Sequence, residues 1–317
     1  MPEDFDILVA ESFDDSALER LRRIGRLRST TAVDEDGLRR EVPGADALLV
    51  RSYAQVTVSV IEAADRLKVI GRGGAGLDNV DLAAARRRGI AVVYTPAAAS
   101  DSVAEFTVGL MLALERRLVS AEALLRSGRF HEARAAAAGR ELRGLTLGIV
   151  GMGRIGSSVG RICGAGLGMK VRYNDVVAIT GLEYEAEPVD KARIWAESDV
   201  ITLHVPLTGQ TRHLVDVDVL QHVQPGATLI NTSRGPVVDG AALAAALTEG
   251  RLAGAALDVF EPEPPDADHP LLSAPNVLPT PHLAARTREG SARMNDVVDD
   301  VMAVLTGRQV QYPAPQA

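Results

Sequence analysis

The segment Gly-Met-Gly-Arg-Ile-Gly at 151–156 constrains this chain more than any other feature, because of what stands on either side of it. The apolar run 145–150 before it predicts a buried parallel strand, and the small residues of 157–163 after it can form a helix. A further strand, predicted at 170–174, leads into Asp175, about 20 positions beyond the glycines. This order of elements predicts a dinucleotide-binding βαβ unit, whereas the glycines alone would also fit a turn without a ligand.

The parts of this unit suit the diphosphate and ribose of a dinucleotide. Glycines let the backbone turn tightly and approach a pyrophosphate, and the N-terminus of the next helix offers N–H groups and a partial positive charge. Asp175 can accept hydrogen bonds from the adenosine ribose hydroxyls, and it is followed by Val176 and Val177 with no cation for a 2′-phosphate, which favours NAD over NADP. The turn residues expected to contact NAD are Gly151, Gly153, Arg154, Ile155 and Gly156.

The composition is that of a globular chain, and its 317 residues leave room for two α/β domains. The net charge of -8 argues against nucleic acid as the main partner, because phosphate backbones bind basic surfaces. No apolar run could span a bilayer, the acidic start predicts no signal peptide, and a single cysteine fits a reducing cytoplasm. That cysteine, Cys163, is interpreted as a packing residue, and no residue cluster has metal-ligand spacing, so no metal is expected.

Short apolar runs alternate with helical stretches, which predicts an α/β protein with two doubly wound parallel sheets, Rossmann-like or flavodoxin-like. Strands are predicted at 7–10, 47–50, 68–70, 90–93, 145–150, 170–174, 200–205, 228–231, 254–258 and 276–279. Helices are predicted at 14–24, 36–42, 80–88, 102–122 and 287–305. The Ala-rich stretch 129–143 lacks strong periodicity and fits either an extended arm or a dimer contact.

Three strand ends in the second half of the chain carry the side chains best suited to chemistry. Ligands sit at the carboxyl ends of strands in an open parallel sheet, which places Arg234 at a crevice. Its planar guanidinium can grip a carboxylate and the adjacent oxygen, although a structural ion pair is the alternative. Glu263 stands on a proline-stiffened loop and His282 after the last strand; an acidic surface turn and a satisfied loop histidine are their alternatives. The other five histidines have no comparable setting.

An arginine, a carboxylate and a histidine after successive strands of one dinucleotide unit together predict hydride transfer. The cofactor carries the hydride, and the protein has to hold an acid and move a proton at the oxygen that becomes hydroxyl or carbonyl. In reduction, His282 would donate its proton as the hydride reaches carbon, and Arg234 would stabilise the charge that grows on oxygen. Glu263 would hold the imidazole and favour its protonated form.

These motifs resemble the D-2-hydroxyacid dehydrogenase family, and within it the phosphoglycerate dehydrogenase branch, over nearly the whole chain. The matching segments are 51–52, 71–81, 102–105, 151–156, 204–208, 232–235 and 258–260. The resemblance implies an NAD-dependent enzyme with Arg234, Glu263 and His282 as its catalytic trio, and a homodimer joined through the nucleotide domains. It further implies a cleft between a substrate-binding domain at 1–98 plus 287–317 and an NAD-binding domain at 99–286.

The resemblance also assigns binding residues. Those expected at the cofactor, besides the turn and Asp175, are His204, Val205, Pro206, Thr211, Thr232, Ser233, Asp258, Ala284 and Ala285. Those expected at the substrate are Arg51, Ser52, Arg72, Gly74, Ala75 and Gly76. The backbone amides of 74–76 would receive the substrate carboxylate. Arg51 and Arg72 could bind a second anion such as a phosphate, or could be ordinary surface arginines.

The expected function is oxidoreduction at C2 of a small D-2-hydroxy or 2-oxo acid, with or without a phosphate or phosphonate. Departures from the family pattern at 94–99, Leu145, Phe130, Ala284 and Arg286 leave the chemistry intact and the substrate open. Two alternatives share the fold, an NADH-sensing corepressor-like binding protein and an enzyme that oxidises phosphite. Formate oxidation is disfavoured, because enzymes of that branch usually carry glutamine where Glu263 stands.

Overall fold

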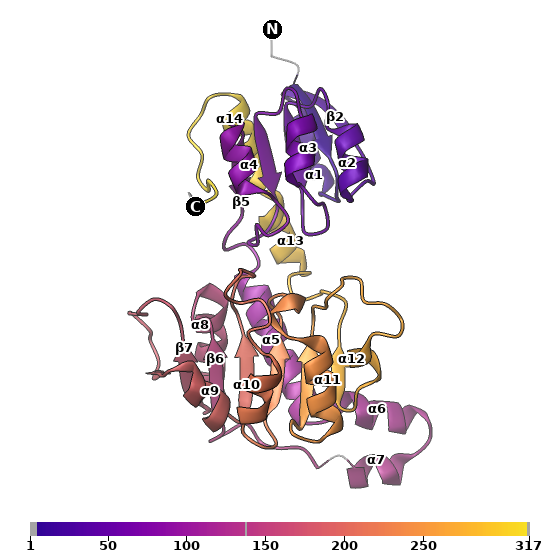
Figure 1. Cartoon of the computed structure of the whole chain (residues 1–317), viewed down its shortest axis with the longest axis vertical. Helices are drawn as coiled ribbons and strands as arrows, with labels where there is room; N and C mark the ends of the chain where they lie inside the picture. Colours follow the sequence, from indigo (N-terminus) through magenta and orange to yellow (C-terminus); the bar gives the residue numbers. More distant parts are fainter. Residues whose placement is uncertain (1–4, 137, 316–317) are drawn as a thin grey trace. The chain divides into compact units, whose positions relative to one another are not determined.

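The computed structural model describes residues 5–136 and 138–315, which form two compact α/β units (Figure 1). The first unit runs up to Ala99 and resumes at Arg286, and the second unit is Ser100–Ala285. Every pair of neighbouring strands in the two sheets is parallel. The prediction of two parallel-sheet α/β domains is therefore confirmed. No helix in these described ranges is long and apolar enough to cross a membrane.

The first unit has a five-stranded sheet in the flavodoxin-type order β2-β1-β3-β4-β5. Its strands are β1 (Phe5–Val9), β2 (Gly25–Ser29), β3 (Ala47–Val50), β4 (Val69–Arg72) and β5 (Ala91–Tyr94). Its helices are α1 (Asp15–Arg22), α2 (Glu35–Glu41), α3 (Val58–Ala63), α4 (Leu82–Arg87), α13 (Arg288–Asn295) and α14 (Val297–Leu305). Residues of α1 and α14 share one apolar core with the sheet, and residues of α2, α3 and α4 share another, so the sheet is covered on both faces.

Three elements of the first unit differ from the prediction, one of them the helix α3, which was not predicted. The single helix expected at 287–305 is two helices, α13 and α14, with a break at Asp296. Val301 of α14 packs so closely on Gly71 that a Cβ at Gly71 would lie 2.4 Å from its methyl group. The edge strand β2 was not predicted, and the C-terminal tail extends the opposite edge, where Pro313 pairs antiparallel with Val93.

The second unit has a seven-stranded sheet in the order β12-β11-β10-β9-β6-β7-β8. Its strands are β6 (Thr146–Val150), β7 (Lys170–Asn174), β8 (Glu187–Pro188), β9 (Val200–Leu203), β10 (Thr228–Asn231), β11 (Gly254–Leu257) and β12 (Val277–Pro279). Its helices are α5 (Ser100–Glu115), α6 (Leu118–Arg126), α7 (Phe130–Ala136), α8 (Arg154–Arg161), α9 (Lys191–Glu197), α10 (Val217–His222), α11 (Gly240–Thr248) and α12 (Pro270–Ser273). The strand order reverses between β6 and β9, and this switch point is where a Rossmann-type sheet binds its nucleotide.

The helix predicted at 102–122 is also wrong, because α5 ends at Glu115 and α6 begins at Leu118. The chain returns against the end of α5: Arg140 N–H donates to the Glu115 carbonyl (3.0 Å), and the Arg140 guanidinium binds the Glu115 carboxylate at 2.8 and 2.9 Å. A straight continuation of α5 would take this carbonyl for itself, and instead Arg117 adopts a left-handed conformation with φ 52°. The stretch 129–143, left open as an extended arm, contains the helix α7.

Candidate active site

The glycine turn after β6 has the geometry that a dinucleotide requires. Gly151 has φ 94°, and a Cβ there would lie 2.5 Å from the His204 carbonyl oxygen. A Cβ at Gly156 would lie 2.1 Å from the Gly151 carbonyl oxygen, so this position packs the helix against the turn. Around Gly153, by contrast, the described residues leave the space open, and α8 begins there without a side-chain cap. The first amides of α8 therefore remain for an anion, and the turn fits the diphosphate of NAD.

Asp175 is fixed at the end of β7 by two backbone amides. One carboxylate oxygen accepts from Met152 N–H at 2.6 Å, and the other accepts from Val177 N–H at 3.1 Å. Val176, next to it in the sequence, is 96% exposed, so the residue that follows this carboxylate presents apolar surface. This arrangement suits a ribose diol and disfavours a ribose phosphate.

The loop after β9 contains four residues expected at the cofactor. His204 donates its backbone N–H to the Val150 carbonyl (2.8 Å), and its Nε2 lies 3.0 Å from the Thr202 hydroxyl. Its Nδ1 is buried without a partner in the described part of the chain, and burial lowers the pKa of His204 to about 3. His204 is therefore neutral near pH 7 and unsuited to carrying a proton. The Thr211 hydroxyl donates to the Pro206 carbonyl (2.6 Å), which closes the loop on itself.

The turn after β10 presents Arg234. Asn231, which is buried, donates from its side chain to the Arg234 carbonyl (2.8 Å) and accepts from the amide and the hydroxyl of Ser233 (3.0 and 2.7 Å). The Arg234 guanidinium donates back to the Ser233 carbonyl at 2.7 Å. A Cβ at Gly235 would lie 1.9 Å from the Phe260 carbonyl oxygen, so this turn sits directly against the loop that carries Glu263. The neighbouring Thr232 shares a hydrogen bond of 2.9 Å with Thr107 of α5.

His282 and Glu263 meet at the ends of the next two strands. His282 Nδ1 lies 2.5 Å from Glu263 Oε1, and both side chains are about three-quarters buried. His282 Nε2 has no hydrogen-bond partner among residues 5–136 and 138–315, so it remains for a substrate. His282 has φ 54°, a left-handed conformation that costs a residue with a side chain about 1 kcal/mol or more. Its backbone N–H donates to the carbonyls of Asp258 (2.9 Å) and Thr280 (3.1 Å).

Asp258 lies under the His282 loop rather than in the open. Its carboxylate is fully buried and accepts from the Thr280 hydroxyl (2.6 Å) and from the amides of Leu283 and Ala284 (both 2.8 Å). Three donors already fill most of its acceptor capacity. The structure therefore gives Asp258 a structural role, and a contact with the cofactor stays a prediction, as it does for Ala285.

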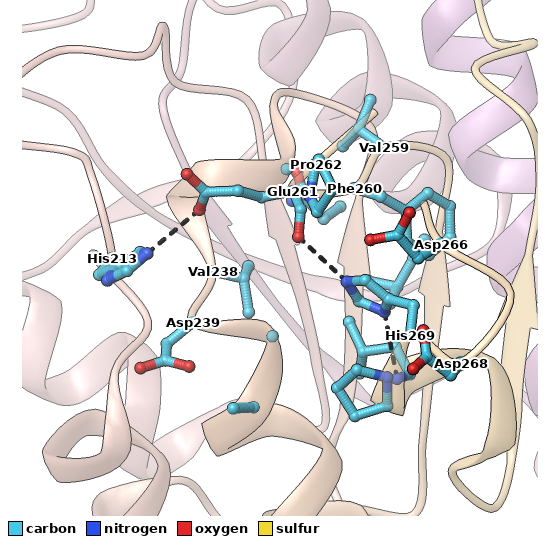
Figure 2. Close-up of a pocket in the computed structure, with 17 residues that line it drawn as sticks. His213, Val238, Asp239, Val259, Phe260, Glu261, Pro262, Asp266, Asp268 and His269 are labelled. Carbon is cyan, nitrogen blue, oxygen red and sulfur yellow. Dashed lines mark hydrogen bonds and ion pairs between the residues drawn. The ribbon is translucent and has the colours of Figure 1, made fainter. Parts of the chain in front are cut away.

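A cavity of about 460 Å³ lies beside the Glu263 loop (Figure 2). Glu261, Phe260 and His269 line one side of it, and Val238 and Asp239 line the other. Arg234, Glu263 and His282 are not among its lining residues. The cavity therefore lies beside the loop that carries Glu263, and the three residues of the predicted catalytic trio do not line it.

In the first unit, the loop after β4 carries the expected carboxylate-binding amides. Gly74 N–H donates to the Thr95 hydroxyl at 2.7 Å, so this amide is already used. The amides of Ala75 and Gly76 have no partner in the described ranges, and both residues are at least partly exposed. Arg72 is buried, and a Cβ at Gly74 would lie 1.8 Å from its guanidinium, which shows that the arginine lies along this loop. Two of the three expected amides therefore remain to donate hydrogen bonds to a carboxylate.

Arg51 is tied into the first unit by internal partners. Its guanidinium donates to the Ser12 carbonyl (2.7 Å) and to the Asn295 side chain (2.5 Å), and it lies 4.8 Å over the Phe13 ring. Burial lowers its pKa. Glu11 accepts hydrogen bonds from the amides of Arg51, Tyr53 and Ala54 at 2.6 to 3.2 Å, which shapes the loop containing Ser52. Arg51 is therefore not the free surface cation that the sequence allowed.

Several polar residues that support the site were not predicted: Glu11, Thr95, Asn231, His269 and Asn295. The first three and Asn295 each bind a backbone group or a side chain of a predicted residue, whereas His269 binds the Glu261 carbonyl and the Leu271 amide. Asparagine directly after a buried strand is the one signal that could have indicated Asn231. Within the described residues, no group of three or more His, Cys, Asp or Glu side chains is placed to hold a metal ion.

Comparisons with known proteins agree with this geometry. Residues 108–284 match the family described as "D-isomer specific 2-hydroxyacid dehydrogenase, NAD binding domain". A hydroxypyruvate reductase of Thermotoga maritima is 39% identical over 306 residues, which are 95% of this chain and 98% of that protein. A D-3-phosphoglycerate dehydrogenase of Archaeoglobus fulgidus is 40% identical over 96% of this chain, and the chain spans 58% of the length of that protein.

Solved structures give the same result for the fold. The crystal structure of a D-lactate dehydrogenase of Aquifex aeolicus, in complex with NAD and lactic acid, superposes with a TM-score of 0.86 at 33% identity. That match covers 95% of this chain and 96% of the other. The chain therefore has the fold of a protein whose structure has been solved with NAD bound.

Proposed function

Because the chain belongs to the family of D-isomer-specific 2-hydroxyacid dehydrogenases, we propose that it transfers a hydride between NAD and C2 of a small 2-oxo or D-2-hydroxy acid. The observation that carries the proposal is the hydrogen bond between His282 and Glu263, 2.5 Å long, at the carboxyl ends of neighbouring strands. The same sheet places the glycine turn at its switch point. A proton carrier and a nucleotide turn on one sheet edge are the two parts that such a reaction needs.

The catalytic roles follow from the hydrogen bonds. NAD, when bound, supplies or accepts the hydride. The Nδ1–H of His282 donates its hydrogen bond to Glu263, which leaves Nε2 for the substrate. Nε2 then donates a proton to the substrate oxygen in reduction and removes it in oxidation. Glu263 orients the imidazole and stabilises its positive charge. Arg234 offers a planar fork of donors for the carboxylate and the reacting oxygen of the substrate.

In the first unit, we assign the amides of Ala75 and Gly76 as hydrogen-bond donors to the substrate carboxylate. A second anionic group would have to compete for Arg51 with the Ser12 carbonyl, the Asn295 side chain and the Phe13 ring. This competition supports unphosphorylated acids, such as those in the names of the hydroxypyruvate and glyoxylate reductases that match this chain at 39% and 41% identity. Hydroxypyruvate and glyoxylate are the substrates we propose.

The test is the consumption of NADH by the purified protein with a panel of 2-oxo acids, with and without a terminal phosphate. We expect turnover of hydroxypyruvate and glyoxylate and a lower kcat/KM for phosphohydroxypyruvate. A higher kcat/KM for the phosphorylated acid would assign Arg51 and Arg72 to a phosphate. Tight binding of NADH without turnover of any acid, and with Arg234→Ala indistinguishable from the parent protein, would instead favour an NADH-sensing binding protein. Reduction of NAD by phosphite would favour the other alternative.

We further propose that the arm of α6 and α7 joins two copies of the chain. No residue of α6 is buried, and large apolar side chains on the arm are about half exposed, namely Leu118, Val119, Leu125 and Phe130. Exposed apolar groups on one segment of a soluble domain favour a contact with another protein surface. Leu125→Glu is expected to shift the mass in solution, measured by light scattering, from dimer to monomer. A parent protein that is already a monomer would overturn the proposal.

A further inference from the structure

The loop between β11 and α12 carries Glu263 but has few buried residues of its own. From Glu261 to Asp268 its residues are exposed or half-exposed, and the next buried residue is His269, at 8% exposure. Glu263 has to stay within 2.5 Å of His282 for the proposed chemistry. The loop therefore needs a contact that fixes its position, and the buried side chain at its far end is His269.

The His269 imidazole makes one hydrogen bond with each ring nitrogen (Figure 2). Leu271 N–H, at the start of α12, donates to Nδ1 (3.3 Å), so Nδ1 acts as an acceptor. Nε2 lies 3.1 Å from the Glu261 carbonyl oxygen, which can only accept. These two bonds together assign the neutral tautomer with its proton on Nε2. The ring thus connects the cap of α12 to the backbone two residues before Glu263.

The ring is held in place by packing as well. Phe260 meets it edge to face, with ring centroids 5.7 Å apart and planes at 84°. A Cβ at Gly240, the first residue of α11, would lie 3.5 Å from His269 Cε1, in ordinary contact. His269 therefore packs between α11 and Phe260, the residue by which this loop enters the apolar core of the unit.

Other supports of the loop are weaker. The cavity of about 460 Å³ lies against Glu261 and Pro262, so the loop faces open space on that side (Figure 2). The Glu261 carboxylate pairs with Arg212 (2.6 Å) and His213 (3.2 Å), but these side chains are 38 to 52% exposed. Exposed ion pairs contribute little in water. The partly buried hydrogen bond from the buried His269 ring to the Glu261 backbone is the stronger tether.

We propose that His269 is a positioning residue for the reaction: through the hydrogen bond from its Nε2 to the Glu261 carbonyl, it holds Glu263 within reach of His282. This inference rests on the proposed function, since it gives His269 a role only through the Glu263–His282 pair. His269 itself touches neither of these two side chains in the structure.

Two variants separate the tether from the cap. In His269→Asn the amide oxygen takes the place of Nδ1 and keeps the helix cap, while the donor to Glu261 is lost. In His269→Gln the amide nitrogen takes the place of Nε2 and keeps the donor. We expect kcat for 2-oxo acid reduction to fall about tenfold in His269→Asn, as for the loss of one buried hydrogen bond, and to stay within about twofold in His269→Gln. KM and NADH affinity stay at parent values in both. Parent kcat in His269→Asn, or an equal loss in both variants, overturns the proposal.

Glu263→Gln supplies the background that shows whether His269 acts through Glu263. With the carboxylate gone, its exact placement matters less, so adding His269→Asn should lower kcat by less than twofold instead of about tenfold. A full tenfold loss in both backgrounds means that His269 acts independently of Glu263, and overturns the proposal. Glu261→Gln is the matched control, because it alters the exposed ion pairs and keeps the backbone carbonyl; we expect parent kcat.

The tautomer of His269 can be measured without following the reaction. Long-range 15N spectra of the histidine rings should show His269 protonated on Nε2, with the signal assigned by its loss in His269→Asn. A ring protonated on Nδ1 overturns the tether. If the tautomer is as expected but Glu263→Gln has the parent kcat, the tether stands as a structural fact and the proposed function fails at Glu263.

Discussion

Replacing Glu263 by glutamine removes one charge from the catalytic pair and keeps its shape. The pair is three-quarters buried, and unit charges about 4 Å apart interact by roughly 4 kcal/mol at the effective dielectric constant of a protein surface. The amide can still accept the Nδ1–H bond, so we assign about 2–3 kcal/mol to the lost charge. Since each 1.36 kcal/mol is a tenfold change in rate, kcat should fall by about 10²-fold.

The assay is the steady-state reduction of a 2-oxo acid with saturating NADH. We expect the loss in kcat, with little change in NADH affinity, because Glu263 binds none of the residues of the glycine turn. Glu261→Gln makes the same change of charge two residues earlier, where the carboxylate is bound to exposed partners, and should keep kcat within about twofold. Equal losses in the two variants would refute the reasoning, because they would show that the general charge of the loop matters and the pair does not.

Three further substitutions test other parts of the site. Asp175→Ala removes the carboxylate anchored by Met152 and should weaken NAD binding and reduce the preference over NADP in fluorescence titrations; an unchanged preference would rule out the ribose role. Gly235→Ala puts a Cβ 1.9 Å from the Phe260 carbonyl and should lower both kcat and the free energy of unfolding, the latter by about 1–3 kcal/mol in urea; parent values of both would contradict the close contact. Because burial lowers the pKa of His204 from 6.5 to about 3, the unfolded chain takes up a proton first, and stability is lost as pH falls from 6.5 towards 3. The free energy of unfolding of His204→Gln should therefore decline less over this pH interval than that of the parent. An equal decline in the two proteins would contradict the lowered pKa of His204.

The parts of the fold that follow from local sequence could be predicted well. Gly151 has φ 94°, and a Cβ there would lie 2.5 Å from a carbonyl oxygen, so only glycine fits this position. Because this requirement is the same in every such turn, the glycine motif predicts the turn from the sequence alone. The buried strand β3 is an uninterrupted apolar run, and β9 is interrupted only by Thr202, since both faces of a parallel sheet are covered. β2 was missed, because the sequence Gly-Arg-Leu-Arg-Ser has one large apolar residue and its strand conformation comes from pairing with β1.

The helix boundaries that were wrong have tertiary causes. The sequence after Glu115 continues with good helix formers, and nothing local indicates that Arg140, 25 residues later, takes the Glu115 carbonyl. The break at Asp296 is likewise not marked by glycine or proline, and the two helices on either side of it are both amphipathic enough to be joined in a sequence-based prediction. Propensity alone cannot place such breaks.

The same limit applies to the site. Arg234, Glu263 and His282 are predictable because each follows a strand of one sheet, and strand ends converge. His269 had no motif to mark it, since its partner is a backbone carbonyl whose position depends on the loop. Asp258 could be seen to end a strand, but its three donors lie 22 to 26 residues further along the chain. Sequence thus indicates which groups can react, and the structure shows which groups hold them.

The residues that fix the loops of Arg234, Glu263 and His282 explain how the same reaction can act on different acids. In the second unit, Asn231 fixes the Arg234 turn, Gly235 fits it against the Glu263 loop, and Asp258 fixes the His282 loop, all through backbone or buried polar contacts. A change in any of these would move a reacting group, so this part of the molecule tolerates little variation. The amides of Ala75 and Gly76, which are proposed to bind the substrate carboxylate together with Arg234, lie instead on a loop of the first unit. Arg51 of that unit is positioned by Asn295, which is not part of the proposed catalytic pair. Substrate preference can therefore change in the first unit while the chemistry of the second is kept.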